Sequence, residues 1–494
     1  MRDPVHEPPS LGALGSLVRQ VAEVVGERHC ISDPAGLLVY ECDGLTHGRT
    51  RPGLVVLPAS SEEVVGVVKL ATAAGVPIVP RGAGTGLSGG ARPTPGCMVV
   101  SLARMNRLLA LDLENGTARV EPGVINLEVS RAVESAGWYY APDPSSQGVC
   151  TIGGNVSENS GGAHCLKYGF TVNHVLAARV VLEGGELVEL GGPALDLPGY
   201  DLLAVLVGSE GMLGLVTEVT LRLLRKPEAT RTFFATFPST DEAGEAVSGI
   251  IAAGILPAAI EMMDRLAISA AKAATGVDWP EVGAALLMDA DGPRAEAEAV
   301  AGLSADIARR AGALEVRVPR DEAERALMWK GRKCAFAAMG RLSPNYLVED
   351  GVIPRSRIAA VLRDIERLAA EARLRVANVF HAGDGNLHPL VLYDARVPGE
   401  EERAAELGRA ILRLCLKYGG SITGEHGVGT EKAQVMAEMF AEPDLDTMAR
   451  VRCAFDPPGR FNPGKVFPTP RLCGERPGPY RPHPVELTGE AERW

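Results

Sequence analysis

Short apolar runs alternate with longer amphipathic segments along the first half of the chain. Residues 54–58 (LVVLP) and 77–80 (PIVP) predict two buried strands. Between them, Ser60 and Glu63 have the spacing of a capping box, which predicts a helix over residues 62–74. This strand–helix–strand order is typical of a βαβ unit.

The alternation continues to about residue 227. It predicts a helix at 14–26, a strand at 117–124, a helix at 126–137 and a half-buried strand at 215–224. Residues 179–190 predict a β-hairpin that turns on Gly184-Gly185.

The second half of the chain shows a similar pattern. Its predicted strands are 232–237, 258–263, 284–290, 314–318, 345–350 and 375–380. Helices are expected between them, one of them within residues 294–311. Strands joined by helices in this order indicate an α+β sheet with helices on one face.

These elements divide the chain into four parts. They are an N-terminal helical lead-in (1–50), a first domain (51–227), a second domain (228–470) and a Pro-rich tail (471–494). The composition of the tail predicts that it packs little against the rest of the chain.

Composition and charge exclude several classes of function. The 494-residue chain has a formal net charge of −12, which argues against nucleic-acid binding, because a basic surface supplies most of that affinity. No apolar run reaches the ~18 residues of a membrane span, and residues 1–10 lack the apolar core of a signal peptide. We therefore expect a cytoplasmic location. The nine cysteines are scattered and none forms a CxxC pair, so we expect no iron–sulfur cluster.

Residues 81–91 (RGAGTGLSGGA) match the GxGxxG dinucleotide pattern. A Rossmann fingerprint needs a helix that begins at its third glycine, but Pro93 and Pro95 follow here and cannot both lie inside a helix. Consecutive small residues can instead expose backbone N–H groups in a concave nest that binds phosphate. A plain flexible loop is the alternative.

Two further glycine-rich segments favour a binding role. Residues 141–169 are too long for a mere connection, and residues 207–223 place glycines directly before a strand. Together, the three segments can line one elongated crevice.

These segments resemble the flavin-binding domain of the vanillyl-alcohol-oxidase/PCMH type. Four later motifs, WKGRKCAFAAMGRLSPNYLVEDGVIP, HAGDGNLHPL, GEHGVGTEK and FNPGKVFP, are similar to the catalytic D subunits of bacterial glycolate oxidase and occur in the same order. The resemblance covers roughly residues 20–475 and extends to D-lactate dehydrogenases. It implies a PCMH-type FAD-binding domain of two subdomains over 51–227. An FAD-linked oxidase domain would follow, with an α+β (ferredoxin-like) substrate or cap part and a helical C-terminal segment.

The resemblance also implies which residues bind FAD. They are Pro80, Arg81, Gly82, Ala83, Gly84, Thr85, Gly86, Ser88, Asp143, Pro144, Ser145, Gly153, Gly154, Asn155, Ser160, Glu210, Gly214 and Val216. Several members of the wider family attach the flavin to a histidine in or near the first loop. This loop contains no histidine, so we expect non-covalent FAD. His164, in the second glycine-rich segment, is the one histidine that speaks for a covalent bond instead.

Residues 375–393 predict a hairpin from their own pattern. Asp384-Gly385 is a strong two-residue turn between apolar strands. Folding on that turn pairs His381 with His388 on one face, with Cβ atoms ~4.5–5.5 Å apart. Two imidazoles at that spacing can converge on a metal ion. A cross-strand histidine pair without metal is the alternative.

A third ligand is available in residues 421–429 (SITGEHGVG), where glycines flank Glu425 and His426. Two histidines and one carboxylate leave an open coordination position, as catalytic divalent sites do. The resemblance implies that His381, His388 and Glu425 hold the metal, zinc or manganese, and that His426 faces the substrate. For the Glu425-His426 pair, an ordinary solvated turn is the alternative.

An anion site is also expected, because a 2-hydroxy acid carries a carboxylate. Arg332 offers a bidentate fork near the end of a predicted helix, although Lys330 and Arg332 could instead be surface charges at a helix C-terminus. Related 2-hydroxyglutarate dehydrogenases carry a threonine and a lysine in this region. The corresponding positions here, around Phe336 and Val348, are apolar, which disfavours a dicarboxylic substrate.

The combined sites predict oxidation of a small 2-hydroxy acid, glycolate to glyoxylate. Arg332 and the metal would bind its carboxylate, His426 would take the hydroxyl proton, and the Cα hydrogen would leave as a hydride to flavin N5. D-lactate dehydrogenase is the nearest alternative, followed by a non-redox transferase of the ether-lipid type and a metal hydrolase. The resemblance implies an iron–sulfur subunit and a second flavin-type subunit as partners, at the inner face of the cytoplasmic membrane.

Overall fold

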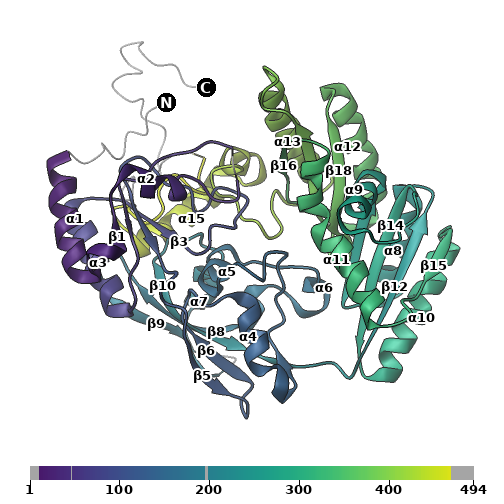
Figure 1. The fold of residues 1–494 in the computed structure, drawn as a ribbon, viewed down its shortest axis with the longest axis horizontal. Helices are drawn as coiled ribbons and strands as arrows, with labels where there is room; N and C mark the ends of the chain where they lie inside the picture. The colour runs from purple at the N-terminus through teal and green to yellow at the C-terminus, as the bar shows by residue number, and fades with distance from the viewer. Residues whose placement is uncertain (1–10, 46, 195–197, 469–494) are drawn as a thin grey trace.

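Three larger β-sheets organise the computed structural model, which describes residues 11–45, 47–194 and 198–468 (Figure 1). Two of the sheets belong to the N-terminal half, and the third, with nine strands, belongs to the other half. The two halves lie beside each other, and the end of the chain, in yellow, returns to the purple and blue N-terminal half (Figure 1).

The first sheet has the strand order β1-β2-β4-β3, and β4 pairs in parallel with both β2 and β3. Its strands are β1 (Cys30–Ile31), β2 (Leu54–Val56), β4 (Met98–Ser101) and β3 (Ile78–Arg81). Helices α1 (Leu11–Val25) and α3 (Ser61–Ala74) share one apolar cluster with these strands, which includes Leu17, Val21 and Val67. The predicted βαβ unit is therefore confirmed.

The start of α3 follows the predicted capping pattern with one difference. Ser60 Oγ accepts a hydrogen bond from the Glu63 N–H at 3.2 Å. The Glu63 carboxylate accepts from the N–H of Ala59 at 2.8 Å, one residue before the predicted partner. The helix ends at Gly75, whose φ of 67° lies in the left-handed region that favours glycine.

The second sheet is antiparallel, with the strand order β5-β6-β10-β8-β9. Its strands are β5 (Leu108–Asp112), β6 (Thr117–Val120), β10 (Leu215–Arg222), β8 (Val175–Val181) and β9 (Leu187–Gly191). The predicted hairpin is confirmed, since Val181 pairs with Leu187 across a turn that contains Gly184-Gly185. The other short elements of this half are α4 (Asn126–Val133), β7 (Trp138–Tyr139), α5 (Ile152–Glu158), α6 (Cys165–Tyr168), α7 (Leu202–Leu206) and β11 (Leu224–Arg225).

The third sheet has the order β15-β12-β14-β13-β18-β19-β17, and β20 pairs with β16 and β18. Its strands are β15 (Glu315–Arg317), β12 (Ala229–Phe237), β14 (Ala284–Gly292), β13 (Ala259–Asp264), β18 (Arg375–His381), β19 (Asn386–Leu387), β17 (Gly351–Val352), β16 (Asn345–Val348) and β20 (Pro389–Tyr393). All its strand pairs are antiparallel.

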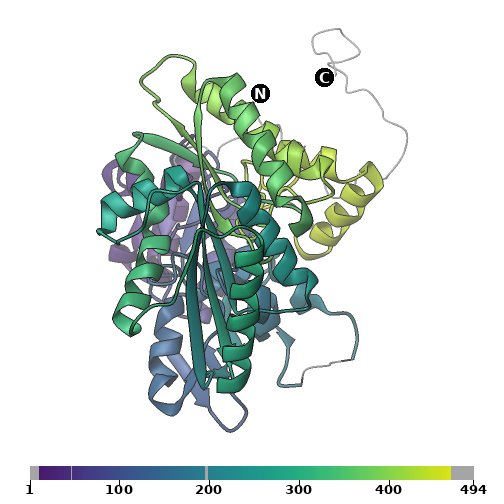
Figure 2. The same cartoon turned by 90° about the vertical axis from the view of Figure 1, so that its right-hand side faces the viewer.

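Helices cover both faces of this sheet, so the expectation of helices on one face was wrong. One face packs against α8 (Thr240–Ala252), α10 (Arg294–Arg310), α12 (Ile358–Ala372) and α13 (Glu400–Lys417). The other packs against α9 (Arg265–Thr275) and α11 (Glu322–Ala338). Figure 2 shows the central strands between these helices. Along β12, Phe233 and Phe234 point to opposite faces and both are buried, which requires cover on each side.

The remaining C-terminal helices, α14 (Met436–Met439) and α15 (Glu442–Phe455), share an apolar cluster with Leu412 of α13, and Phe455 of α15 packs against the cluster of the second sheet. The predicted Pro-rich tail (471–494) lies wholly outside the described residues. Within the described ranges, helices of a length and hydrophobicity suited to crossing a bilayer are not found.

Candidate active site

A crevice of about 410 Å³ lies between the two halves of the chain. One wall consists of the glycine-rich segments of the N-terminal half. The other wall includes Lys333, Phe336, Tyr346, Val348, His388, Glu425 and His426. The crevice therefore brings the expected FAD loops together with His426, one of the two expected catalytic residues.

Every residue expected to bind FAD lines this crevice except Ser88 and Asp143. Ser88 is fully buried, and its Oγ donates a hydrogen bond to the carbonyl of His426 at 2.9 Å. The carboxylate of Asp143 contacts His164 Nδ1 at 2.9 Å. Both side chains therefore support the crevice wall from behind. The sequence reasoning missed Glu158, which lines the crevice beside Glu210.

The glycine loop is not a Rossmann turn, as predicted. It follows β3, and residues 82–97, all of which are described, contain no helix. Gly84 has a φ of 72°, and a Cβ there would lie 2.2 Å from the guanidinium of Arg81. The positive φ favours glycine at this position, and a side chain there would also displace the guanidinium of Arg81.

The hairpin that carries the two histidines has a different register from the predicted one. His381 lies opposite Asn386, and Asn378 lies opposite Pro389, so the connection is a four-residue loop (382–385) and not a two-residue turn. His388 is two residues beyond Asn386 and therefore remains on the same face as His381. The two ring centroids are 5.1 Å apart. The predicted pairing was wrong, but the predicted convergence of the two histidines is confirmed.

Glu425 completes a compact cluster with these histidines. Its Oε1 lies 3.1 Å from His381 Nε2 and 3.3 Å from His388 Nε2. One ligand atom from each of the three side chains lies within 4.8 Å of the others. Both ring nitrogens of His388 are buried without a hydrogen-bond partner. Imidazole and carboxylate donors with unused lone pairs fit a divalent metal.

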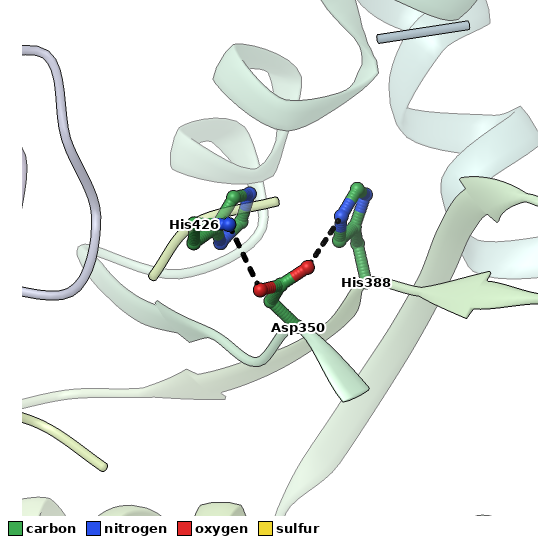
Figure 3. Close-up of side chains that lie close together, drawn as sticks. All are labelled: Asp350, His388 and His426. Carbon is green, nitrogen blue, oxygen red and sulfur yellow. Dashed lines mark hydrogen bonds and ion pairs between the residues drawn. The ribbon is translucent and has the colours of Figure 1, made fainter. Parts of the chain in front are cut away.

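Asp350, which the sequence reasoning missed, lies between His388 and His426 (Figure 3). Its Oδ2 accepts hydrogen bonds from the Thr423 hydroxyl at 2.6 Å, the Gly424 N–H at 3.0 Å and the His426 N–H at 2.9 Å. The Lys432 ammonium lies 3.1 Å from the same oxygen.

Asp350, His388 and His426 also lie close enough together to hold a metal. The Asp350 carboxylate already accepts several hydrogen bonds, however, and the buried Lys432 ammonium beside it would repel a divalent cation. Of the two groups, His381, His388 and Glu425 are therefore the better suited to hold a metal. Asp350 fixes the backbone of the turn that carries Glu425 and His426.

Glu261 is a second buried carboxylate that sequence reasoning missed. It lies opposite His381 in the pairing of β13 with β18, and its Oε1 is 2.7 Å from His381 Nδ1. Its Oε2 is 2.5 Å from Nη2 of Arg332. The only sequence signal was an acid within an otherwise apolar strand, AIEMM.

Arg332 is buried behind the crevice wall and is not among the residues that line it. The ring of Phe336, which does line the crevice, lies 5.9 Å from the guanidinium carbon. Besides its ion pair with Glu261, Arg332 has an Nε without a hydrogen-bond partner. The surface-charge alternative for Arg332 is therefore wrong.

The charges around the cluster suit proton abstraction near neutral pH. Burial would raise the pKa of Glu425, but the neighbouring His381 and His388 outweigh it and lower this pKa to about 2. Burial lowers the pKa of His426 to about 4, despite the opposing charge of Asp350. A neutral imidazole that lines the crevice is able to accept a proton.

His164 joins the two halves of the chain beside the crevice. Its ring stacks on Trp329 of α11, with centroids 5.8 Å apart. The Trp329 Nε1–H donates to Asp289 at 3.2 Å. Burial would lower the pKa of His164, but the charge of Asp143 raises it to about 9. The imidazolium therefore links a flavin-side loop to the third sheet.

We expect His164→Gln to lower the free energy of unfolding by about 1–2 kcal/mol at pH 6 and by almost nothing at pH 10. The folded-state pKa of about 9 exceeds the ordinary histidine pKa of 6.5. The stabilisation is therefore complete below about pH 6.5 and is lost as the pH rises through 9. Urea titrations of both proteins at the two pH values measure it. An equal loss at pH 6 and pH 10 would contradict an ionic role.

Two family models together match most of the chain. The model of the FAD binding domain matches residues 52–191, and that of the C-terminal domain of FAD linked oxidases matches residues 226–466.

Curated relatives match along nearly their whole length. Glycolate oxidase subunit GlcD of Escherichia coli (strain K12) is 51% identical, over 89% of this chain and 88% of the relative. Glycolate oxidase subunit GlcD of Bacillus subtilis (strain 168) is 40% identical, over 91% and 96%. A D-lactate dehydrogenase of Anaerostipes hadrus is 32% identical, over 91% and 97%.

Solved structures share the fold at low sequence identity. The 4-ethylphenol oxidase from Gulosibacter chungangensis superposes with a TM-score of 0.78 at 19% identity, over 94% of this chain and 99% of that one. An alkyldihydroxyacetonephosphate synthase superposes with a TM-score of 0.73 at 20% identity, over 93% and 87%. These likenesses support the architecture, in which an FAD-binding domain is followed by a mixed α+β domain.

Proposed function

The chain belongs to the family of FAD-linked oxidases, and on that premise we propose that it is the catalytic subunit of a glycolate oxidase. The observation that carries the proposal is the 51% identity to a glycolate oxidase subunit over 89% of the chain. The crevice supports it, since the glycine-rich loops face a buried histidine–carboxylate cluster across one cavity. The product is glyoxylate.

FAD occupies the crevice without a covalent bond in this proposal. The glycine loop has no histidine, and His164 contacts Asp143 and Trp329 and does not line the crevice. When bound, FAD supplies the acceptor of the hydride from the substrate Cα.

A divalent metal, zinc or manganese, is held by His381, His388 and Glu425 in this proposal. It supplies a Lewis acid beside the substrate hydroxyl. Support comes from the unpartnered ring nitrogens of His388 and from the low pKa of Glu425, which keeps this carboxylate ionised.

Residues of the chain itself supply the proton acceptor and the donor to the substrate carboxylate. The neutral imidazole of His426 takes the hydroxyl proton, and Asp350 keeps that imidazole in place through the backbone N–H of His426. The Nε of Arg332, which has no hydrogen-bond partner, is the donor proposed for the substrate carboxylate, and the Phe336 ring beside its guanidinium lines the crevice. His426 would thus take the hydroxyl proton of the substrate, and bound FAD would supply the hydride acceptor.

The test is an anaerobic visible spectrum of the purified chain with glycolate and then with D-lactate. Bleaching of a yellow flavin by glycolate is the expected result. Bleaching by D-lactate alone would favour the D-lactate dehydrogenase alternative, to which the 32% identical relative points. Net turnover with an artificial electron acceptor would exclude a non-redox transferase. A colourless protein that takes up no FAD would overturn the proposal.

Electrons leave through partner subunits in this proposal. The relative named as a subunit of glycolate oxidase points to a complex of several chains. An iron–sulfur subunit and a second flavin-type subunit would pass the electrons to a quinone-type acceptor, at the cytoplasmic face of the membrane.

We expect Glu261→Gln to weaken metal binding about 10–100-fold, as the loss of an outer-shell carboxylate does. The change removes the charge that orients His381 and that pairs with Arg332. Metal content after dialysis against a graded chelator measures the affinity. Glu298→Gln, at an exposed ion pair, is the matched control. Equal metal retention by both variants would argue against the proposed ligand set.

A further inference from the structure

The FNPGK motif (461–465) returns to the first sheet after α15. Phe461 forms a parallel bridge with Ile78, and the N–H of Asn462 donates to the carbonyl of Ile78 at 2.7 Å. Phe461 is fully buried in the apolar cluster under this sheet. The motif thus extends the sheet at β3, the strand that leads into the glycine loop.

The side-chain amide of Asn462 joins two loops of the FAD crevice. Its Nδ2 donates to the carbonyl of Gly90 at 2.8 Å and to the carbonyl of Glu210 at 2.6 Å. Asn462 is 1% exposed, whereas Gly90 and Glu210 both line the crevice. A primary amide has two N–H donors on one nitrogen, so one side chain satisfies both buried carbonyls.

Glu210 passes this connection on to the turn that carries His426. Its Oε1 accepts from the Val428 N–H at 2.6 Å, and its Oε2 accepts from the Gly429 N–H at 2.8 Å. Val466, just after the motif, donates its N–H to the Gly429 carbonyl at 3.0 Å. Lys465 Nζ donates to the carbonyl of Arg92 in the glycine loop at 2.9 Å. One short segment therefore holds the glycine loop, the Glu210 loop and the His426 turn.

We infer that Asn462 is a positioning residue that sets the spacing of the FAD loops and aligns the His426 turn with them. This inference rests on the proposed function for the role of His426, but not for the binding of FAD. The backbone at Asn462 has a φ of 41°, a left-handed conformation that asparagine tolerates better than most residues. Both the conformation and the two donors thus favour asparagine here.

The test compares Asn462→Gly with wild type. Glycine adopts a positive φ without strain, so the change removes the amide and leaves the backbone path accessible. We expect the dissociation constant for FAD, measured by flavin fluorescence on FAD-free protein, to rise at least tenfold. At saturating FAD, we expect anaerobic flavin reduction by glycolate to slow at least tenfold. Asn462→Asp, which keeps the shape but has no donor, should be no better.

Arg373→Gly is the matched control. Arg373 also has a positive φ, 54°, but it lies at the end of α12 in the other half of the chain. The FAD affinity of the Arg373→Gly variant and the rate of its flavin reduction by glycolate should match those of wild type. If Asn462→Gly binds FAD and is reduced within twofold of wild type, the inference is overturned. The thermal midpoint of FAD-free Asn462→Gly measures how much the change destabilises the fold in general. The inference is also overturned if that general destabilisation accounts for the whole loss of FAD affinity. If the wild-type protein binds FAD but glycolate does not reduce the flavin, the proposed function is overturned. The test of FAD affinity still holds in that case.

Discussion

Replacing His426 with alanine is expected to leave FAD bound and to slow flavin reduction by glycolate about 10²–10⁴-fold, the usual contribution of a positioned general base. His426 lines the crevice, and burial holds its pKa at about 4, so its imidazole is neutral and able to accept a proton at pH 7. Alanine removes the acceptor, but the turn keeps its backbone bonds to Asp350 and Ser88. Stopped-flow absorbance at the flavin band measures the rate.

His29→Ala is the control for this variant. His29 is partly exposed, lies just after the N-terminal helix α1 and does not line the crevice. It should be reduced at the wild-type rate. A small proton acceptor such as free imidazole should restore part of the rate in the alanine variant if the loss is chemical. A reduction rate of His426→Ala within threefold of wild type would remove this residue from the role of base.

The glycine loop and the histidine hairpin show what the sequence alone could predict. Pro93 and Pro95 exclude a helix for local steric reasons, so the rejection of a Rossmann turn needed no tertiary information. The hairpin register was wrong, yet His381 and His388 still share a face. Strand side chains alternate with a period of two, so the change from a two-residue to a four-residue loop left both histidines on the same side.

The carboxylates of Asp350 and Glu261, which hold the site residues in place, could not be predicted from local sequence patterns. Asp350 lies 76 positions from the His426 N–H that it binds, and Glu261 lies 120 positions from His381. Glu261 meets His381 through the pairing of β13 with β18, and Asp350 lies between β16 and β17 and binds a distant turn. Single-sequence periodicity determines neither contact. The resemblance implies that Arg332 binds the substrate, and the structure adds an ion pair with Glu261 that no local pattern predicted.

The cover on both faces of the third sheet did have a local signal. The runs TFFATF and AALLMDA are almost continuously apolar, which is typical of strands buried on both sides. The order of strands and helices alone suggested one layer of helices. That order does not determine which face of the sheet each helix covers. The apolar continuity of β12 and β14 was the better guide.

Replacing Asp350 with asparagine is expected to lower the free energy of unfolding by about 3–5 kcal/mol, because it leaves the Lys432 ammonium buried without its partner. Both side chains are fully buried, and their ion pair is 3.1 Å long. Burial would raise the pKa of Asp350, but Lys432 outweighs it and lowers this pKa well below the usual value, so the carboxylate stays ionised. Urea unfolding followed by tryptophan fluorescence measures the loss.

The double variant Asp350→Asn/Lys432→Met separates this charge effect from the loss of hydrogen bonds to the turn. Removing the unpaired ammonium should recover a large part of the stability, since apolar replacement of a buried pair costs little. Flavin reduction should be slow in both Asp350→Asn and the double variant, because the N–H groups of Gly424 and His426 lack their carboxylate in both. Asp306→Asn, at an exposed ion pair with Arg309, should change stability by less than about 0.5 kcal/mol. If Asp350→Asn loses less than about 1 kcal/mol, the buried pair is not what stabilises the turn, and the hydrogen bonds to its backbone must account for the position of His426.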